Sequence, residues 1–141
     1  MLSAHYMAFR AWLTGDAWFT GKVDAVVRRN AAGDLVRANY AILTPAIPDR
    51  LSDERFTATQ RATSSARFTF DVRCVAVDAD GALLWAEKTI GRLVGHSLTV
   101  AGRSCDPITL VEGVEENAVE YDRVANLYYV DMSFRFHSWE A

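Results

Sequence analysis

The chain has 141 residues, of which half are apolar and 23% are charged, and its net charge is −3. This length supports one domain with a hydrophobic core and is short for two, so we expect a single domain over residues 1–141. The composition is typical of a folded chain and excludes a disordered one. Because phosphate contacts need clustered Lys and Arg, the negative balance argues against a dedicated nucleic-acid binder.

Targeting segments are not indicated. Residues 1–10 lack the basic start and the uninterrupted apolar stretch of a signal peptide, and no apolar run approaches the length of a membrane span. We therefore expect synthesis in a reducing cytoplasm and no membrane partner.

The first predicted element is a short amphipathic helix. Leu2, Tyr6, Phe9 and Leu13 recur at helical spacing, and the pair at 15–16, Gly-Asp, can end the helix.

A hairpin is predicted next. Residues 22–28 alternate between apolar and polar, turn-forming residues follow at 30–34, and residues 35–43 form the return strand. Four residues of the return strand are expected to point inward: Val36, Ala38, Tyr40 and Ile42.

An extended arm is predicted at about residues 44–65. Residues 44–55 hold two prolines and five charged side chains, which excludes a central strand or a helix interior. Mixed charges of this kind serve either solubility or a self-complementary contact between neighbouring copies, and both readings stay open. The candidate protein-interaction residues of the arm are Asp49, Arg50, Asp53, Glu54, Arg55 and Arg61.

Two long strands are predicted at 66–78 and 126–138, because apolar and polar side chains alternate along each. The apolar faces consist of Ala66, Phe68, Phe70, Val72, Cys74 and Ala76 in the first strand, and of Tyr128, Val130, Met132, Phe134 and Phe136 in the second.

Between the long strands we expect a second helix, at about 82–94. Helix-capping residues occur at 78–81, and the helix should end at Gly95. Short strands are predicted at 98–100, 108–111 and 118–121, with a turn around 102–107. The apolar stripe of the helix is predicted to be Leu83, Ala86, Ile90, Leu93 and Val94.

These elements predict an α+β fold. It should consist of a single mixed or antiparallel sheet with two helices packed on one face and an extended arm.

No reaction centre is indicated by the motifs. The three histidines, His5, His96 and His137, fall in different elements, and the glycines do not form a phosphate loop. Cys74 and Cys105 do not have the spacing of a zinc motif. The acidic cluster Glu112, Glu115, Glu116, Glu120 and Asp122 does not match a calcium loop and is better explained as a solvated rim. We expect no catalytic residues, no cofactor and no metal site.

Four stretches of the chain, together with the order of the elements, resemble a known family. They are RANYAILTP at 37–45, FTFDVRCVA at 68–76, RLVGHSLTVAGR at 92–103 and YYVDMSFRF at 128–136. The chain resembles the tail terminator proteins of long-tailed bacteriophages from its first helix to its last strand. The likeness depends on arrangement and short apolar signatures rather than on a catalytic motif.

The resemblance implies a structural virion protein, assembled in the host cytoplasm, that forms a homo-hexameric ring at the head-proximal end of the tail. Such a ring caps the tail tube protein and docks to the head-tail connector or stopper protein. Genomic DNA passes through its lumen without sequence-specific binding. Sheet edges and an extended arm contact neighbouring subunits in such proteins, so residues 49–61 are the expected contact here.

Two other readings stay open. One is a head-completion or stopper protein of the same joint, which is usually more strand-dominated. The other is a small enzyme or ligand-binding domain of the nuclear-transport-factor-like type, with a pocket between a curved sheet and several leading helices. That pocket would need Asp131, Arg135 and His137 to face inward, whereas the alternation places them opposite the aromatic side chains.

Overall fold

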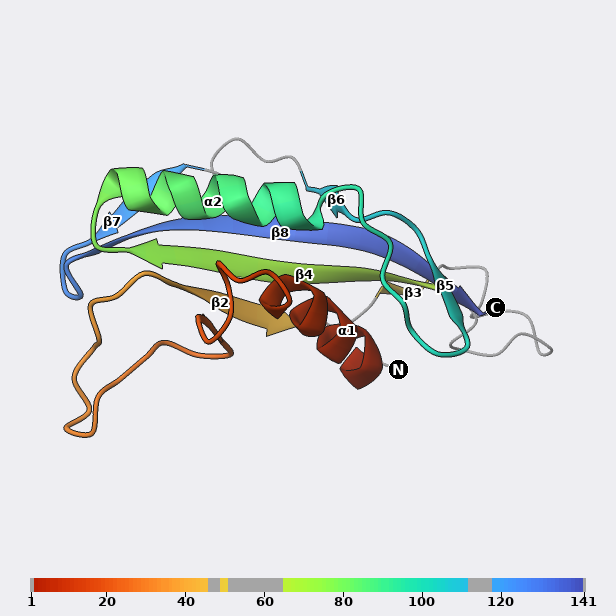
Figure 1. The fold of residues 1–141 in the computed structure, drawn as a ribbon, viewed down its shortest axis with the longest axis horizontal. Helices are drawn as coiled ribbons and strands as arrows, with labels where there is room; N and C mark the ends of the chain where they lie inside the picture. The colour runs from red at the N-terminus through yellow and green to blue at the C-terminus, as the bar shows by residue number, and fades with distance from the viewer. Residues whose placement is uncertain (1, 46–48, 51–64, 112–117, 141) are drawn as a thin grey trace.

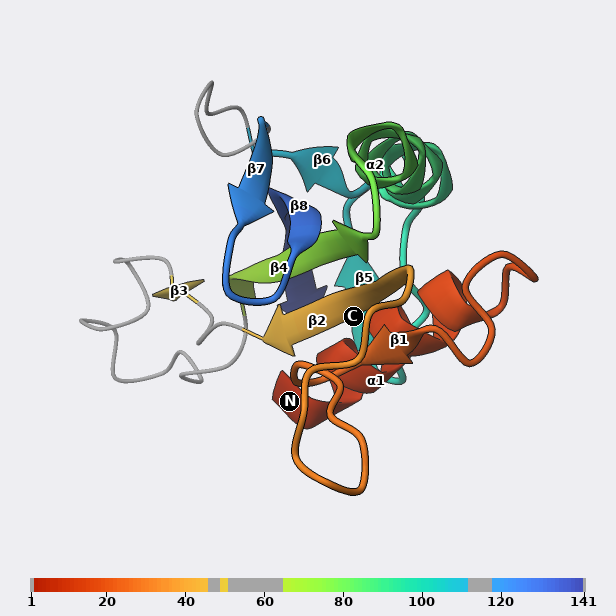
Figure 2. The ribbon, with the colours of Figure 1, turned by 90° about the vertical axis from the view of Figure 1, so that its left-hand side faces the viewer.

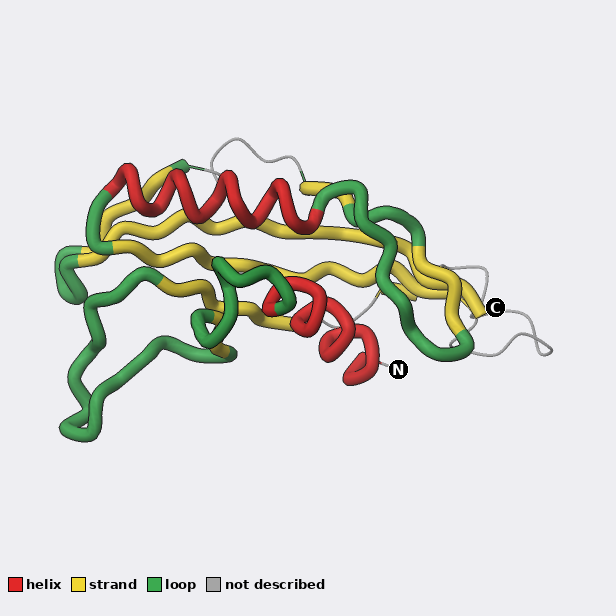
Figure 3. The backbone as a smooth tube through the Cα atoms, viewed as in Figure 1, coloured by secondary structure: helices red, strands yellow, loops and turns green. Residues whose placement is uncertain are grey.

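The structure is a computed structural model that describes residues 2–45, 49–50, 65–111 and 118–140. This part of the chain forms two helices and one sheet (Figures 1 and 3). In chain order the elements are α1 (Leu2–Thr14), β1 (Val23–Asp24), β2 (Tyr40–Pro45), β3 (Asp49–Arg50), β4 (Ser65–Ala76), α2 (Ala79–Leu93), β5 (Arg103–Cys105), β6 (Thr109–Leu110), β7 (Val119–Asp122) and β8 (Leu127–Glu140).

β4 and β8 form the centre of the sheet. They pair antiparallel along nearly their whole length, from Ser65 opposite Trp139 to Ala76 opposite Tyr128. β2 pairs antiparallel with β4, and β1 runs parallel to β2 at one edge, while β5, β6 and β7 all pair with β8. The predicted α+β fold with a single mixed sheet is confirmed.

Both helices cover the same face of the sheet, as predicted. The ring of Phe9 on α1 lies 4.8 Å from that of Phe70 on β4 and 6.4 Å from that of Phe134 on β8. The hydroxyl of Thr89 on α2 lies 3.3 Å from the sulfur of Cys74, on the same side of β4 as Phe70. Figure 1 shows α2 running along β8 and α1 beside β2 and β4.

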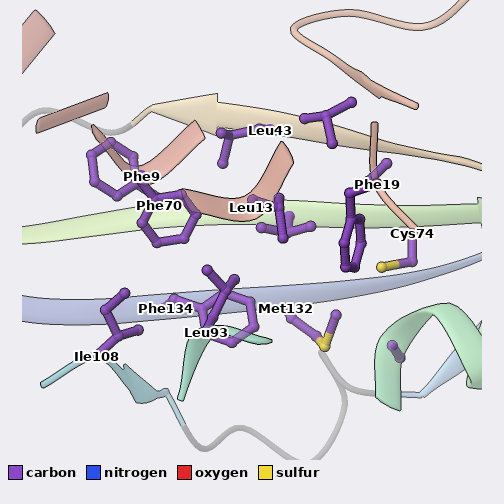
Figure 4. Close-up of a cluster of buried hydrophobic side chains, with 14 of the residues drawn as sticks. Phe9, Leu13, Phe19, Leu43, Phe70, Cys74, Leu93, Ile108, Met132 and Phe134 are labelled. Atoms are coloured by element: carbon purple, nitrogen blue, oxygen red, sulfur yellow. The ribbon is translucent and has the colours of Figure 1, made fainter. Parts of the chain in front are cut away.

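Large side chains fill the layer between helices and sheet. Burying each Phe or Leu of this layer contributes about 1.5–3 kcal/mol. Figure 4 labels ten core residues, which come from both helices, three strands and two connecting segments: Phe9, Leu13, Phe19, Leu43, Phe70, Cys74, Leu93, Ile108, Met132 and Phe134.

Helix α2 has the predicted cap and end, and its predicted apolar stripe is buried in part. The carboxylate of Asp78 accepts a hydrogen bond from the Gly81 N–H at 2.6 Å, and Gly95 ends the helical region with φ 87°. Leu83 and Val94, both predicted to face the core, are 52% and 42% exposed. Ala86 and Leu93 of the predicted stripe are buried and Ile90 packs against the core. Trp85, which lies outside the predicted stripe, is also buried and shifts the centre of the buried face toward its own side. The buried residues are Ala82, Trp85, Ala86, Thr89 and Leu93.

The predicted hairpin at 22–43 is wrong. β1 runs parallel to β2, with Val23 opposite Ala41, and residues 25–39 form a long connecting loop. The turn within this loop does form, because the side chain of Asn30 accepts hydrogen bonds from two later N–H groups, yet the ladder stops at one bridge, Arg29 opposite Leu35. The loop must travel along the sheet to bring two parallel strands together.

The inward side of β2 is also opposite to the prediction. Ala41 and Leu43 face the helices as members of the main core. Tyr40 and Ile42 point to the other face of the sheet, where they pack with Val75 and Leu127 in a second, smaller cluster.

The short strands agree with the predictions only in part. Residues 98–100 form no strand, β6 lies within 108–111, and β7 overlaps 118–121. β5 lies where we predicted a turn, because Cys105 pairs with Ser138 near the end of β8. Such a distant pairing leaves no local signal in the sequence.

The predicted arm lies largely outside the described residues. Its first part ends β2 at Pro45, and β3 then pairs with β4, with Asp49 opposite Arg67 and Arg50 opposite Ala66. β3 therefore pairs with β4 on the same side as β2, farther along β4, at the edge of the sheet. No helix in the described part of the chain is long and apolar enough to cross a membrane.

Candidate interaction surface

The face of the sheet opposite the helices, termed the outer face, carries the polar side chains of the two long strands. Strand alternation places every second residue of β4 and β8 there, and β7 adds Glu120. The outer-face residues of the two long strands include Arg67, Thr69, Asp71, Arg73, Asp131, Ser133, Arg135 and His137.

A charged network crosses three strands of the outer face. Arg73 on β4 donates two hydrogen bonds to the Asp131 carboxylate on β8, at 2.7 and 3.0 Å. The Arg73 guanidinium also lies 4.3 Å from the ring centre of Tyr129, whose hydroxyl donates to Glu120 on β7 at 2.6 Å. The network therefore joins β4, β8 and β7 through their side chains as well as their backbones.

The network presents fixed charges rather than a proton-transfer group. The hydrogen bond to Asp131 raises the pKa of Arg73, and the hydrogen bond to Glu120 raises the pKa of Tyr129. Both groups keep their ordinary protonation at neutral pH. Such an arrangement suits electrostatic recognition of another surface better than acid–base catalysis.

An open groove of about 570 Å³ lies beside this network. One wall is apolar and consists of Val26 and Val27 from the 25–39 loop, while Arg73 and Asp131 lie on the charged side. A second groove of about 240 Å³ lies between the same loop and the residues around Leu127. Mixed apolar and charged lining is typical of protein contact surfaces.

The 25–39 loop is attached to the outer face by specific contacts. Arg28 forms an ion pair with Asp24 and lies over the ring of Tyr40, 4.9 Å from its centre. Arg37 donates to the backbone carbonyl of Asn126 at 3.1 Å, which links the loop to the turn between β7 and β8.

The predicted interaction residues are described only in part. Asp49 and Arg50 lie in β3, and the pairing of their backbones with β4 places them at the sheet edge. Asp53, Glu54, Arg55 and Arg61 lie outside the described residues, so their role stays a prediction. Glu112, Glu115 and Glu116 of the acidic cluster also lie outside, whereas Glu120 and Asp122 are on β7.

A buried polar cluster connects α1 to the end of β8. The hydroxyl of Ser138 lies 2.7 Å from His5 Nε2 and accepts a hydrogen bond from Arg103 Nε at 2.9 Å. The thiol of Cys105 lies 3.8 Å from the same oxygen. His5 and Ser138 are both 0% exposed, so substrate has no access to this pair and its role is structural.

The other two histidines are also in separate places. His96 stacks on Trp12, with ring centres 3.5 Å apart, and its pKa is lowered by burial and by the nearby Arg92 charge. His137 lies 3.9 Å from the carboxylate of Asp106. Within the described ranges, no three His, Cys, Asp or Glu side chains come together in a way that could hold a metal ion.

Comparison with known proteins shows the fold. The chain superposes on a chain from the virion of a native gene transfer agent particle with a TM-score of 0.67, at 17% sequence identity, over 97% of this chain and 96% of that one. A second solved chain, which carries no functional name, gives a TM-score of 0.63 at 16% identity, over 100% and 97% of the two chains. No protein-family model matches the sequence, and no curated protein matches it.

Proposed function

We propose that this chain is a structural virion protein, and more specifically a tail terminator that forms a ring, caps the tail tube and joins it to the head connector. The observation that carries the proposal is the similarity in fold to a chain of a gene transfer agent virion, which extends over nearly the full length of both chains. The order of elements that resembles tail terminators in the sequence supports the same role.

The distribution of side chains supports recognition rather than catalysis. The aromatic rings of β4 and β8 that face the helices are packed in the core, and Phe68, Phe70 and Phe134 are each 0% exposed. A nuclear-transport-factor-like domain would need part of that layer to be open for a ligand. The charged residues instead lie on the outer face, beside open grooves.

The net negative charge of the chain supports a ring through which DNA passes without binding tightly. Each copy carries a net charge of −3, so a ring of copies is acidic as a whole. Phosphate binding depends on clustered cations, which a net negative ring disfavours. In this proposal the partners are sister copies, the tail tube protein and the connector or stopper protein.

The proposal is tested by imaging the purified chain with and without tail tubes. Light scattering at micromolar concentration measures its size in solution, and negative-stain microscopy shows whether a ring binds one end of the tube. A ring at the head-proximal tube end supports the terminator role. Compact monomers that ignore the tube and bind a small molecule would overturn it, and a ring bound to the head connector alone would favour a stopper.

A further inference from the structure

Helix α2 carries an exposed stripe on the side opposite the core. Its buried residues face the sheet, whereas Leu84, Glu87, Lys88 and Gly91 follow the i, i+3, i+4, i+7 spacing of the opposite helix face. These four residues line one side of an open groove of about 670 Å³, with Trp12 of α1 on the other side. Figure 2 looks nearly along α2 and shows the helix at a corner of the molecule. The stripe is therefore accessible to a second molecule.

Gly91 lies within this stripe although glycine weakens the interior of a helix relative to alanine. The space that a Cβ atom of residue 91 would occupy is open, with no side chain or other segment of the described chain within 4 Å. Packing within one copy therefore gives no reason for a glycine at this position. A second helix gives one, because the distance between two packed helices depends on the side chains at their contact.

Glu87 and Lys88 carry opposite charges that are not paired within the described part of one copy. No basic residue stands three or four positions from Glu87, and no acidic residue stands three or four positions from Lys88. The Lys88 ammonium lies 5.3 Å from the ring centre of Trp18, and neither charged side chain forms an ion pair with a described residue. Adjacent residues of a helix do not face each other, so the two charges do not satisfy each other either.

We propose that two copies of this chain pair through α2, with the two helices parallel and related by a two-fold axis that runs along them. Such an axis places Leu84 and Gly91 against their own counterparts. It also turns the Glu87 flank of each helix toward the Lys88 flank of the other, so two ion pairs form. Leu84, which is 43% exposed in one copy, is covered in the pair, and the two glycines let the helices approach closely.

The charges select the parallel arrangement. In an antiparallel pair each flank faces the same flank of the other helix, so Glu87 would face Glu87 and Lys88 would face Lys88. Like charges in direct opposition are unfavourable. The stripe is thus complementary to a second copy of itself in one direction only.

This inference goes beyond the proposed function and does not depend on it. A two-fold contact closes after two copies, so it is not the contact that repeats around a ring. One helix from each copy makes a small interface, and small interfaces are typical of weak association. We therefore expect weak pairing whether or not a ring forms.

Disulfide cross-linking tests the contact directly. A Gly91→Cys variant, made in a Cys105→Ser background, is oxidised with copper–phenanthroline and run on a non-reducing denaturing gel. Cys74 does not react, because it is fully buried and burial raises its thiol pKa to about 12. We expect disulfide-linked dimers and no larger species, since a two-fold contact joins each copy to one neighbour. Absence of dimers would overturn the inference.

Two controls test the specificity and the direction of the contact. Ser97→Cys places an exposed thiol on the connection after α2 and should give at least tenfold less dimer than Gly91→Cys. Leu84→Cys protein mixed with tagged Gly91→Cys protein should give no mixed dimer, because positions 84 and 91 meet only in an antiparallel pair. Equal yields from Ser97→Cys and Gly91→Cys, or mixed dimers as the main product, would overturn the inference.

Charge exchange in the Gly91→Cys protein gives a second readout. Glu87→Lys and Lys88→Glu should each lower the dimer yield about tenfold, because each places like charges across the contact. The double variant exchanges the two charges, keeps the net charge and should restore the yield. The two single variants, mixed together, should cross-link to each other. Single variants with an unchanged yield, or a double variant that does not recover, would contradict the pairing.

The two proposals fail separately. A ring on the tail tube, formed by a protein whose Gly91→Cys variant gives no dimer, keeps the terminator role and removes the α2 contact. Dimers from a protein that ignores the tail tube keep the α2 contact and remove the terminator role.

Discussion

His5 on α1 and Ser138 on β8 are joined by a 2.7 Å hydrogen bond between residues 133 positions apart, and both are fully buried. The imidazole also stacks on Phe68, with ring centres 4.0 Å apart. Arg103 approaches the same hydroxyl from β5 and donates a further hydrogen bond to the Ser138 carbonyl at 2.8 Å. The start of the chain, β5 and the end of β8 are thus tied together at one point.

Ser138→Ala should destabilise the fold by about 1–3 kcal/mol, because His5 Nε2 and Arg103 Nε lose their hydroxyl partner at a buried position. The free energy of unfolding in urea measures the effect. Ser104→Ala, on the same short strand as Arg103 but exposed, is the control and should change stability by less than about 0.5 kcal/mol. Equal stability of the two variants would show that the buried cluster contributes little.

Cys74 should resist labelling in the folded protein. Burial raises its pKa to about 12, so its thiolate fraction at pH 8 is on the order of 10⁻⁴. Burial also raises the pKa of the half-buried Cys105, which should react slowly. A thiol reagent should therefore count at most one slow cysteine in the native protein and two in denaturant. Rapid reaction of both native thiols would mean that α2 opens readily from the sheet.

The alternation along β4 and β8 was sufficient to predict both long strands and the face that each buries. Period-two patterning is a local signal, and one covered face makes it strong. The sequence signal that predicts the helix cap at Asp78 is also local. The parallel pairing of β1 and the rotation of α2 depend on which distant residues meet: nothing near Val23 specifies Ala41 as its partner, and nothing near Leu83 shows that Trp85 takes the core position.

The sequence was sufficient to predict that the outer face carries charged side chains. It was not sufficient to predict which of them form the network. Alternation placed Arg73 and Asp131 on polar faces, yet their pairing needs the register of two strands 58 residues apart. Glu120 joins them only because β7 folds back onto β8. The predicted arm contributes Asp49 and Arg50 to the described part, and its other four candidate residues await a test.

Asp78→Ala should destabilise α2 by about 0.5–2 kcal/mol, because the first turn loses the acceptor for the Gly81 N–H. Asp78→Asn keeps a capping oxygen and should recover most of the loss. The unfolding midpoint of the two variants, compared with the unmodified chain, measures the difference. A loss that Asn does not recover would point to the charge of Asp78 rather than to its cap.

The free energy of unfolding should fall as the pH drops below about 6.5, which is the ordinary pKa of histidine. His96 should contribute to this fall. The folded state lowers the pKa of His96, through burial first and then through Arg92. The unfolded chain therefore binds the proton more tightly, so the contribution is present above this pH and is lost as the pH falls through the folded pKa. His96→Gln should flatten this part of the profile, measured as urea midpoints at several pH values. An unchanged profile would assign the pH dependence to other groups.

Removing Arg73 or Asp131 should leave the fold almost as stable as before, because both side chains are more than 40% exposed and water screens the pair. A double-mutant cycle with Arg73→Ala and Asp131→Ala should give a coupling of about 0.2–1 kcal/mol. Salt at about 1 M shortens the screening length to about 3 Å and should reduce that coupling. Arg73→Lys should keep only part of it, since a lysine does not reproduce the two parallel hydrogen bonds. A coupling well above this range, insensitive to salt, would mean that the outer face is shielded from water in solution, as it would be if another copy covered it.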